Sequence, residues 1–222
     1  MELKLRLSVA VDGPAGAGKS TIAKLLGEKF NLMYINTGAM YRAVTLFAVR
    51  GKIAKNNVPM LCEMIQSLEM HFECDKLIVN NEDISEEILL PEISNEVSYY
   101  AAIPEIRKIL VELQRNMSYK YNVIMDGRDI GTVVLKDAPF KFFLTAKAEE
   151  RAQRRYDELL LKGIDLSYNN ILEAINKRDY IDTHREINPL KKAKDAIEID
   201  SSDISIEEVV NIMSGYIDKK FS

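Results

Sequence analysis

The sequence predicts an α/β fold in which a parallel sheet lies between layers of helices, and two patterns lead to this prediction. Apolar residues alternate with polar or small ones over residues 5–11, and after a glycine-rich stretch they recur at helical spacing over residues 22–30. Short apolar runs that end in polar residues return at 121–126, 141–146 and 195–200, with helical patterns between them. Strands that alternate with helices are typical of a three-layer α/β/α fold with a parallel sheet.

The glycine-rich stretch follows the first predicted strand, which ends at Asp12. It reads Gly13-Pro14-Ala15-Gly16-Ala17-Gly18-Lys19-Ser20 and fits the P-loop pattern G-x-x-x-x-G-K-[ST]. Glycines let such a loop turn its backbone N–H groups towards phosphate oxygens. Lys19 can reach the β- and γ-phosphates, Ser20 can ligate Mg²⁺, and a helix that starts near Lys19 adds its positive dipole end. A glycine-rich turn that binds nothing is the alternative, and the order of strand, loop and helix disfavours it.

Composition restricts the class of protein. The 222 residues suit one large domain, or one that carries a small inserted domain, and 47% hydrophobic residues is ordinary for a globular protein. A net charge of −4 and a pI near 5.4 argue against broad nucleic-acid binding. Neither a signal peptide nor a membrane span is predicted, so we expect a soluble, cytoplasmic protein.

Cysteine and histidine give no sign of a metal site. The two residues of each type have no zinc-binding spacing. A disulfide between Cys62 and Cys74 has no support in the sequence, and two reduced cysteines are the simpler interpretation.

Polar residues follow a short second strand that is predicted to end at Asn36, and in open α/β sheets ligands bind beyond the carboxyl ends of the strands. Thr37 comes directly after this strand, and Arg42 lies near the start of a predicted helix over 39–47. We therefore expect both residues in a second, acceptor pocket. A solvated arginine on a helix is the alternative for Arg42.

The apolar strand over 121–126 also ends in charged residues. An acid at the end of such a strand, here Asp126, lies near Mg²⁺ or its water molecules in P-loop enzymes. Arg128 and Asp129 follow one step beyond, at the mouth of the expected site. Three solvated charges in a tight turn are the alternative.

The region between the second and third of these strands contains a change of pattern. Helical spacing over 58–68 gives way to two short predicted strands, 70–74 and 76–80, joined at Cys74-Asp75-Lys76, and then to a polar turn at 81–83. We interpret this hairpin as an inserted subdomain over about residues 69–94. Helices are expected over 91–101, with Ser98 beside the apolar face, and from Pro104, with Arg107 off the apolar stripe, where a surface charge is the simplest interpretation.

Arginines gather in the segments that follow predicted strands. Eight of the eleven lie there: Arg42, Arg107, Arg128, Arg151, Arg154, Arg155, Arg178 and Arg185. Arginine makes bidentate contacts with phosphate, so this distribution favours a compact polyanion such as two bound nucleotides. Arg151 and Arg155 share one helical face, which indicates a phosphate-facing lid or, alternatively, a solvated helix. Arg178, Asp182 and Arg185 share another face if their helix extends that far.

Taken together, these segments resemble the bacterial cytidylate kinases, within the nucleoside monophosphate kinases. The resemblance covers nearly the whole chain. It rests on residues 12–20, on Thr37-Gly38-Ala39-Met40-Tyr41-Arg42, on residues 126–134, on Glu150-Arg151-Ala152 with Arg154-Arg155, and on Arg178-Asp179 with Asp182, Arg185 and Pro189. Jointly and in this order the motifs are highly specific, whereas the P-loop alone is not.

The resemblance implies a single P-loop kinase chain over 1–222 with two further parts beside the core. One is a monophosphate-binding region at 36–119, which holds the β insert, and the other is a helical lid at 149–165. The implied reaction is transfer of the γ-phosphoryl group of ATP to CMP or dCMP with Mg²⁺, by a monomer that needs no nucleic acid or membrane. No dedicated base is expected, because positioning and charge stabilisation suffice for this reaction.

The resemblance also assigns roles by position. ATP would be bound by Gly13, Pro14, Ala15, Gly16, Ala17, Gly18, Lys19, Ser20 and Thr21, and Mg²⁺ by Ser20, with Asp126 acting through water. Cytosine would be surrounded by Thr37, Ser98, Arg107 and Asp129, the CMP phosphate held by Arg42, Arg128 and Arg178, and the sugar contacted by Asp182 and Arg185. The catalytic groups would be Lys19, Arg128, Arg151 and Arg155. Thr37 replaces a serine that is frequent in the family, and its hydroxyl keeps the role.

Three other functions compete with this one. Another small-molecule kinase on the same core, such as an adenylate, uridylate or shikimate kinase, should lack the insert and the Asp126-Gly127-Arg128-Asp129 stretch. A GTP-binding switch is suggested by the N-K-x-D match at 176–179, but the match lies in a helical pattern instead of after a strand. A regulator without activity would be expected to lose Lys19 or the lid arginines, and all are present.

Overall fold

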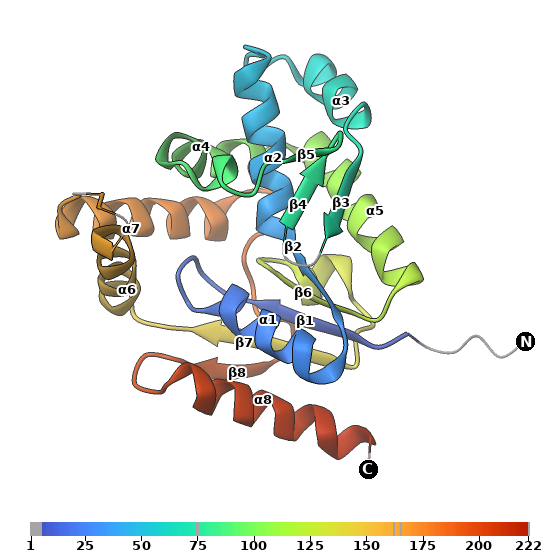
Figure 1. Cartoon of the computed structure of the whole chain (residues 1–222), viewed down its shortest axis with the longest axis vertical. Helices are drawn as coiled ribbons and strands as arrows, with labels where there is room; N and C mark the ends of the chain where they lie inside the picture. Colours follow the sequence, from blue (N-terminus) through green and yellow to red (C-terminus); the bar gives the residue numbers. More distant parts are fainter. Residues whose placement is uncertain (1–5, 74–75, 162, 165, 222) are drawn as a thin grey trace, which may run out of the picture.

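The protein is organised around a five-stranded parallel sheet, shown in Figure 1. The computed structural model describes residues 6–73, 76–161, 163–164 and 166–221. The strands are β1 (Ser8–Asp12), β2 (Met33–Asn36), β6 (Val123–Gly127), β7 (Phe140–Thr145) and β8 (Ile197–Asp200). They lie in the order β2-β6-β1-β7-β8, and every neighbouring pair is parallel. The strand that precedes the glycine-rich loop is therefore at the centre, and the predicted parallel sheet is confirmed.

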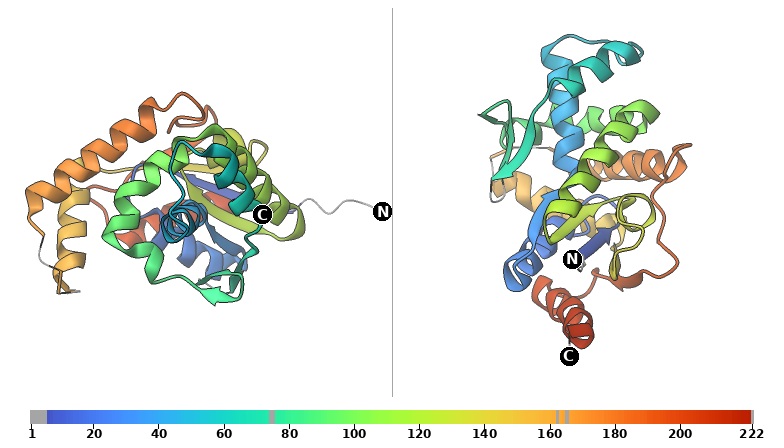
Figure 2. Two further views of the ribbon diagram at one scale, coloured as in Figure 1. Left: turned by 90° about the horizontal axis from the view of Figure 1, so that it is seen from above. Right: turned by 90° about the vertical axis from the view of Figure 1, so that its right-hand side faces the viewer.

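Successive residues of the central strands face two different helical layers. Val9 and Val11 belong to the core formed with α1 (Lys19–Phe30) and α8 (Ile206–Phe221), whereas Ala10 belongs to the core formed with α2 (Thr37–Arg50) and α5 (Pro104–Lys120). Strands buried on both faces are apolar throughout, as strands in the middle of three layers must be. The views in Figure 2 show the two layers on either side of the sheet, so the predicted α/β/α architecture is confirmed.

A second, three-stranded sheet lies beside α2. The predicted hairpin is confirmed, since β3 (Met70–Glu73) pairs antiparallel with β4 (Lys76–Val79). The expected polar turn at 81–83 is wrong: Glu82 and Asp83 form a third strand, β5, against β4. The turn is one residue earlier, where Asn80 and Asn81 have φ of 51° and 65°, and asparagine tolerates this left-handed conformation in two-residue hairpins. The joint at 74–75, and with it the Cys74 end of the unsupported disulfide, lies outside the described residues.

Short helices connect this small sheet with the main one. They are α3 (Val58–Gln66), a 3₁₀ turn at Glu87–Leu89 and α4 (Pro91–Ala102). With α2 and α5 they bury Leu61, Ile65 and Ile93 in the same core as the strand residue Ala10. The segment between β2 and β6 is thus packed continuously onto the sheet. Its boundaries at 36 and 119 as a functional unit stay a prediction.

Two helices stand together beyond the carboxyl end of the sheet, α6 (Ala148–Leu161) and α7 (Tyr168–His184), as Figure 1 shows. They pack through their own small core of Ala152, Leu159 and Ile171. Two residues of the expected lid, Lys162 and Asp165, lie outside the described residues. Helix α7 ends at His184, so Arg185 is the residue that caps it, in extended conformation, instead of its next turn.

In the part of the chain that the structure describes, none of the helices has the length and apolar character needed to cross a membrane.

Candidate active site

The glycine-rich loop connects the buried end of β1 to the start of α1 at Lys19, as the sequence predicts. Gly13, Gly16 and Gly18 have φ of 145°, 77° and 84°, which side chains other than glycine rarely adopt. At Gly13 space is also absent, because a Cβ atom would lie 2.0 Å from the backbone oxygen of Leu144. The three glycines are therefore required by the path of the loop.

Hydrogen bonds on the outside of the loop fix the direction of its peptide groups. The Ala15 carbonyl accepts from Arg151 Nη1 at 2.9 Å, and the Ala17 carbonyl accepts from Ser201 Oγ at 3.3 Å. In a planar trans peptide the N–H points opposite to the carbonyl, so the N–H groups of Gly16 and Gly18 point into the loop. No side chain caps the start of α1. The loop thus directs the N–H groups of Gly16 and Gly18 to the start of α1, as an anion site requires.

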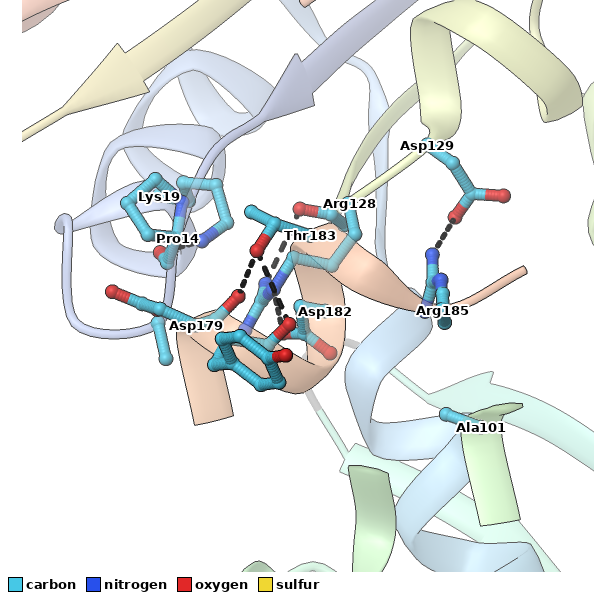
Figure 3. A network of polar contacts seen from close by, with 12 residues as sticks. Pro14, Lys19, Ala101, Arg128, Asp129, Asp179, Asp182, Thr183 and Arg185 are labelled. Atoms are coloured by element: carbon cyan, nitrogen blue, oxygen red, sulfur yellow. Dashed lines mark hydrogen bonds and ion pairs between the residues drawn. The ribbon is translucent and has the colours of Figure 1, made fainter. Parts of the chain in front are cut away.

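Lys19 lies inside this loop with its ammonium group buried. Its Nζ donates to the Pro14 carbonyl at 2.6 Å (Figure 3). Burial, and then the nearby positive charges of Arg128 and Arg178, lower the pKa of Lys19 well below its usual value, while Asp126 acts in the opposite direction. A bound polyphosphate would supply the negative charge that favours the charged form of this lysine.

Asp126, at the end of β6, faces the first turn of α1. Its Oδ2 accepts from Ser20 Oγ at 2.8 Å and its Oδ1 from the Tyr34 hydroxyl at 3.1 Å. Ser20 and Asp126 therefore offer the hard oxygen ligands that Mg²⁺ prefers, and their chemistry fits that ion. Among the described residues no group of three His, Cys, Asp or Glu residues could hold a metal alone.

A cavity lies between α2, α4, α5 and α7, beyond the end of β6. Eight of the nine residues expected at the acceptor line it: Thr37, Ser98, Arg107, Arg128, Asp129, Arg178, Asp182 and Arg185. They come from positions more than 140 residues apart in the sequence, and the fold brings them together. The ninth, Arg42, does not line the cavity.

The cavity wall contains a buried ion pair that the helical pattern did not predict. The expectation that Arg107 lies at the surface is wrong, because its side chain is 2% exposed. Its guanidinium pairs through Nη2 with Asp129 Oδ2 and donates through Nη1 to the Ala101 carbonyl at 3.0 Å. Arg185 Nη2 lies 3.4 Å from the other carboxylate oxygen of Asp129, as Figure 3 shows. The apolar stripe of a helix identifies neighbours of the core, but it gives no sign of a carboxylate supplied by a distant segment.

Tyr41 also lines the cavity, and no role was predicted for it from the sequence. Its hydroxyl is buried without a hydrogen-bond partner among the described residues, and burial raises its pKa to about 12. The Arg107 guanidinium carbon lies 5.4 Å from the centre of its ring. The signal that could have identified Tyr41 is its place inside the Thr37–Arg42 motif, one residue before a nominated arginine.

Three arginines crowd the space between this cavity and the P-loop. Arg128 Nε donates to Asp182 Oδ2 at 2.8 Å (Figure 3), whereas Arg42 and Arg178 each have a buried Nε without a partner among the described residues. Burial and the neighbouring charges of Arg128 and Arg42 lower the pKa of Arg178 to about 9. Burial and Arg128 likewise lower the pKa of Arg42. We call these three residues the arginine cluster; an anion bound to it would relieve their repulsion.

Asp182 is the carboxylate that partly balances the arginine cluster. Burial opposes its ionisation, but the neighbouring Arg128 and Arg178 outweigh burial and lower its pKa. The side chain is 6% exposed, so this charge is compensated inside the protein and not by solvent.

The arginines of α6 do not line the cavity. Arg151 is buried, and its donors are directed at the Ala146 and Ala15 carbonyls and at Asp179 Oδ2. Arg154 donates to the Ser201 carbonyl at 2.5 Å, which ties α6 to the segment behind the P-loop. Arg155 pairs with Glu158 at 2.7 Å near the surface. The expected contacts of Arg151 and Arg155 with a transferring phosphate stay a prediction.

Comparison with known proteins decides which P-loop family this site belongs to. The family profile described as cytidylate kinase matches residues 9–219. The chain belongs to the cytidylate kinase family. It is 65% identical over 216 residues to a cytidylate kinase of Clostridium acetobutylicum, with 97% of this chain and 100% of that protein covered. A cytidylate kinase of Clostridium perfringens is 62% identical over 213 residues, with 96% and 98% covered.

Membership of the cytidylate kinase family makes the chain a phosphotransferase of the nucleoside monophosphate kinase type, and it disfavours a regulator without activity. The N-K-x-D match at 176–179 lies inside α7, so it is not placed as a guanine-binding loop. Among solved structures, an uncharacterized protein from Eubacterium ventriosum is 16% identical with a TM-score of 0.52, covering 96% of this chain and 99% of that one. That likeness supports the fold alone.

Proposed function

We propose that this chain transfers the γ-phosphoryl group of ATP to CMP or dCMP. The observation that carries the proposal is the place of the arginine cluster. Arg42, Arg128 and Arg178 lie between Lys19 of the P-loop on one side and the cavity with the buried Arg107–Asp129 pair on the other. Two phosphate groups that meet at this cluster would be in line for transfer, with charge stabilisation from both sides.

Cytosine recognition is assigned to the polar wall of the cavity. Asp129 is an acceptor for the exocyclic amino group of cytosine, which is a donor. Arg107 and Ser98 can donate to the ring acceptors, and the Thr37 hydroxyl, which donates to the Asp126 carbonyl at 2.7 Å, can accept from the base. Uracil carries an oxygen where cytosine carries the amino group, so a carboxylate at this place would oppose its binding. The buried Arg107–Asp129 pair would therefore select cytosine over uracil.

Catalysis is assigned to positioning and electrostatics. Lys19 and the inward N–H groups hold the donor phosphates, the arginine cluster holds the acceptor phosphate, and Arg151 and Arg155 approach the transferring group. Ser20 and Asp126 would hold Mg²⁺, which neutralises charge on the donor when bound. The hydroxyl-bearing side chains near the cluster do not need to act as a base, because the attacking phosphate oxygen is already ionised at neutral pH.

We assign residues 36–119 to acceptor binding and 149–165 to the lid. We further propose that the protein works as a monomer in the cytoplasm with ATP, Mg²⁺ and CMP or dCMP. The support for these points is the family resemblance and the concentration of acceptor residues in one cavity of one chain.

The direct test is ADP release from Mg·ATP with CMP, dCMP, UMP, AMP and GMP supplied as separate acceptors. We expect turnover with CMP and dCMP, and at least about tenfold lower kcat/KM with UMP, because a carboxylate opposite a carbonyl leaves a buried polar group unpaired. ATP binding without turnover on any monophosphate would contradict the proposal and favour a regulatory protein. Equal turnover of AMP and CMP would indicate a different kinase.

A further inference from the structure

Asp179 forms a partly buried ion pair with Arg151, and Asp179 itself has no part in the reaction described above. It follows Arg178 on α7, and its Oδ2 accepts from Arg151 Nη2 at 2.6 Å, with side chains 23% and 5% exposed. The other carboxylate oxygen, Oδ1, is buried without a hydrogen-bond partner among the described residues. An unsatisfied buried oxygen costs stability, so the site keeps this carboxylate at a cost.

Arg151 connects this carboxylate to the P-loop. While one nitrogen pairs with Asp179, another donates to the Ala15 carbonyl at 2.9 Å, and Nε donates to Ala146. The arginine also lies close above Gly16, where a Cβ atom would be 3.3 Å from Arg151 Cβ. Because the carbonyl of Ala15 is held outwards, the N–H of Gly16 is held inwards, towards the donor phosphates. Asp179 thus orients a phosphate-binding group through one intermediate side chain.

The neighbouring residue on α7 belongs to the other substrate. Arg178 is part of the arginine cluster, and Asp182, one turn later, pairs with Arg128 of the same cluster. Figure 3 shows Asp179 and Asp182 on the same stretch of α7, with Pro14 and Lys19 of the P-loop drawn beside it. A shift of this turn when the acceptor phosphate binds would act on both Arg178 and Asp179.

We propose that Asp179 is a positioning residue that couples the acceptor site to the donor loop. It contacts neither substrate. When bound CMP holds α7 in place through Arg178, Asp179 keeps Arg151 on the Ala15 carbonyl. The P-loop then keeps the backbone conformation that binds the donor phosphates. This inference rests on the proposed function, since it takes Arg178 to bind the acceptor phosphate. It predicts that CMP strengthens binding of the donor, and that this gain depends on the Asp179 charge.

The test uses Asp179→Asn, which keeps the shape of the side chain, and Glu173→Gln as a matched control on the exposed part of the same helix. Calorimetry gives the Kd of a non-hydrolysable ATP analogue with and without CMP. In the wild type and in Glu173→Gln we expect CMP to lower this Kd. In Asp179→Asn we expect the Kd measured with CMP to rise about tenfold and the effect of CMP to vanish, while the KM for CMP stays within about twofold.

A second variant separates positioning from a merely structural role. If Asp179 acts through Arg151, then Asp179→Asn adds no further loss of donor affinity to Arg151→Gln. A purely structural role would lower Tm and leave the effect of CMP on donor binding unchanged, which would overturn the inference. Wild-type protein inactive on every monophosphate would overturn the proposed function instead, whereas an active wild type with an unaltered Asp179→Asn would overturn only this coupling.

Discussion

Asp129 accepts from two arginines that lie 78 positions apart in the sequence, Arg107 and Arg185, and all three side chains are nearly fully buried. The sequence places Asp129 at a strand end, where a functional acid is expected. It does not reveal that Arg107 turns inwards, because the partner that makes burial tolerable comes from another element. A buried arginine without this carboxylate would be strongly unfavourable. Selectivity and stability therefore depend on the same residue.

Asp129→Asn should reduce both properties. We expect the preference for CMP over UMP, as the ratio of kcat/KM values, to fall by about tenfold or more, because an amide can donate to the uracil oxygen. We also expect a loss of about 3 kcal/mol in the free energy of unfolding, because the charges of Arg107 and Arg185 lose their partner. Acceptor kinetics and urea unfolding measure the two effects. Unchanged discrimination would show that another residue reads the base.

The raised pKa of the buried Asp12 carboxyl group makes the free energy of unfolding depend on pH. Its carboxylate accepts from the N–H groups of Ile130 and Gly131 at 2.7 Å each, but burial dominates and raises its pKa to about 6. The folded protein then holds this proton more tightly than the unfolded chain, so the contribution to stability is present below pH 4 and is lost as pH rises to 6. From the size of the shift the loss is about 3 kcal/mol.

The measurement for Asp12 is urea unfolding between pH 4 and 7, with Asp12→Asn as the comparison. We expect the difference in unfolding free energy between the two proteins to change across this window, because the variant lacks the titrating group. A difference that stays constant with pH would contradict the raised pKa.

At the scale of elements, local sequence patterns predicted the strands and helices that carry the site. They failed where a segment takes its structure only from pairing with another segment. The strands that end at Asp12 and Asn36 occur as expected. The strand Glu82–Asp83 was missed because two charged residues have low strand propensity and form a strand only through pairing with β4. Its position is set by the turn before it.

That turn makes a prediction for Asn81. Asn81 has φ of 65°, and a residue with a Cβ that cannot compensate by local hydrogen bonding pays about 1 kcal/mol for this conformation. Asn81→Ala should lower the free energy of unfolding by this amount, whereas Asn81→Gly should change it by less than about 0.5 kcal/mol. Urea unfolding measures both, and kcat should stay at the wild-type value. Equal effects of alanine and glycine would contradict the conformational explanation.

At the scale of the whole molecule, the sheet explains why residues from Asp12 to Arg185 meet. Parallel strands place their carboxyl ends at one edge, so the P-loop, Asp126 and Arg128 could be predicted to share a site. That α7 also lies at this edge of the sheet could not be predicted. Arg178 and Asp182 follow no strand end, and their partners lie on β6 and beyond. Helical spacing, the arginine distribution and the family resemblance pointed to these two residues, but none of them predicted where α7 would lie. Their pairing with Arg128, and that of Arg151 with Asp179, required the structure.

The arginine cluster is arranged to bind the acceptor phosphate, and thermal unfolding with CMP and with cytidine tests this assignment. At about one hundred times Kd, CMP should raise the wild-type Tm by about 5–10 °C, and cytidine, which lacks the phosphate, by much less. Arg178→Gln, freed of like-charge repulsion, should unfold at a higher temperature than the wild type without ligand and should lose most of the response to CMP. An equal response to cytidine and CMP, or an Arg178→Gln variant that still responds fully to CMP, would contradict the account.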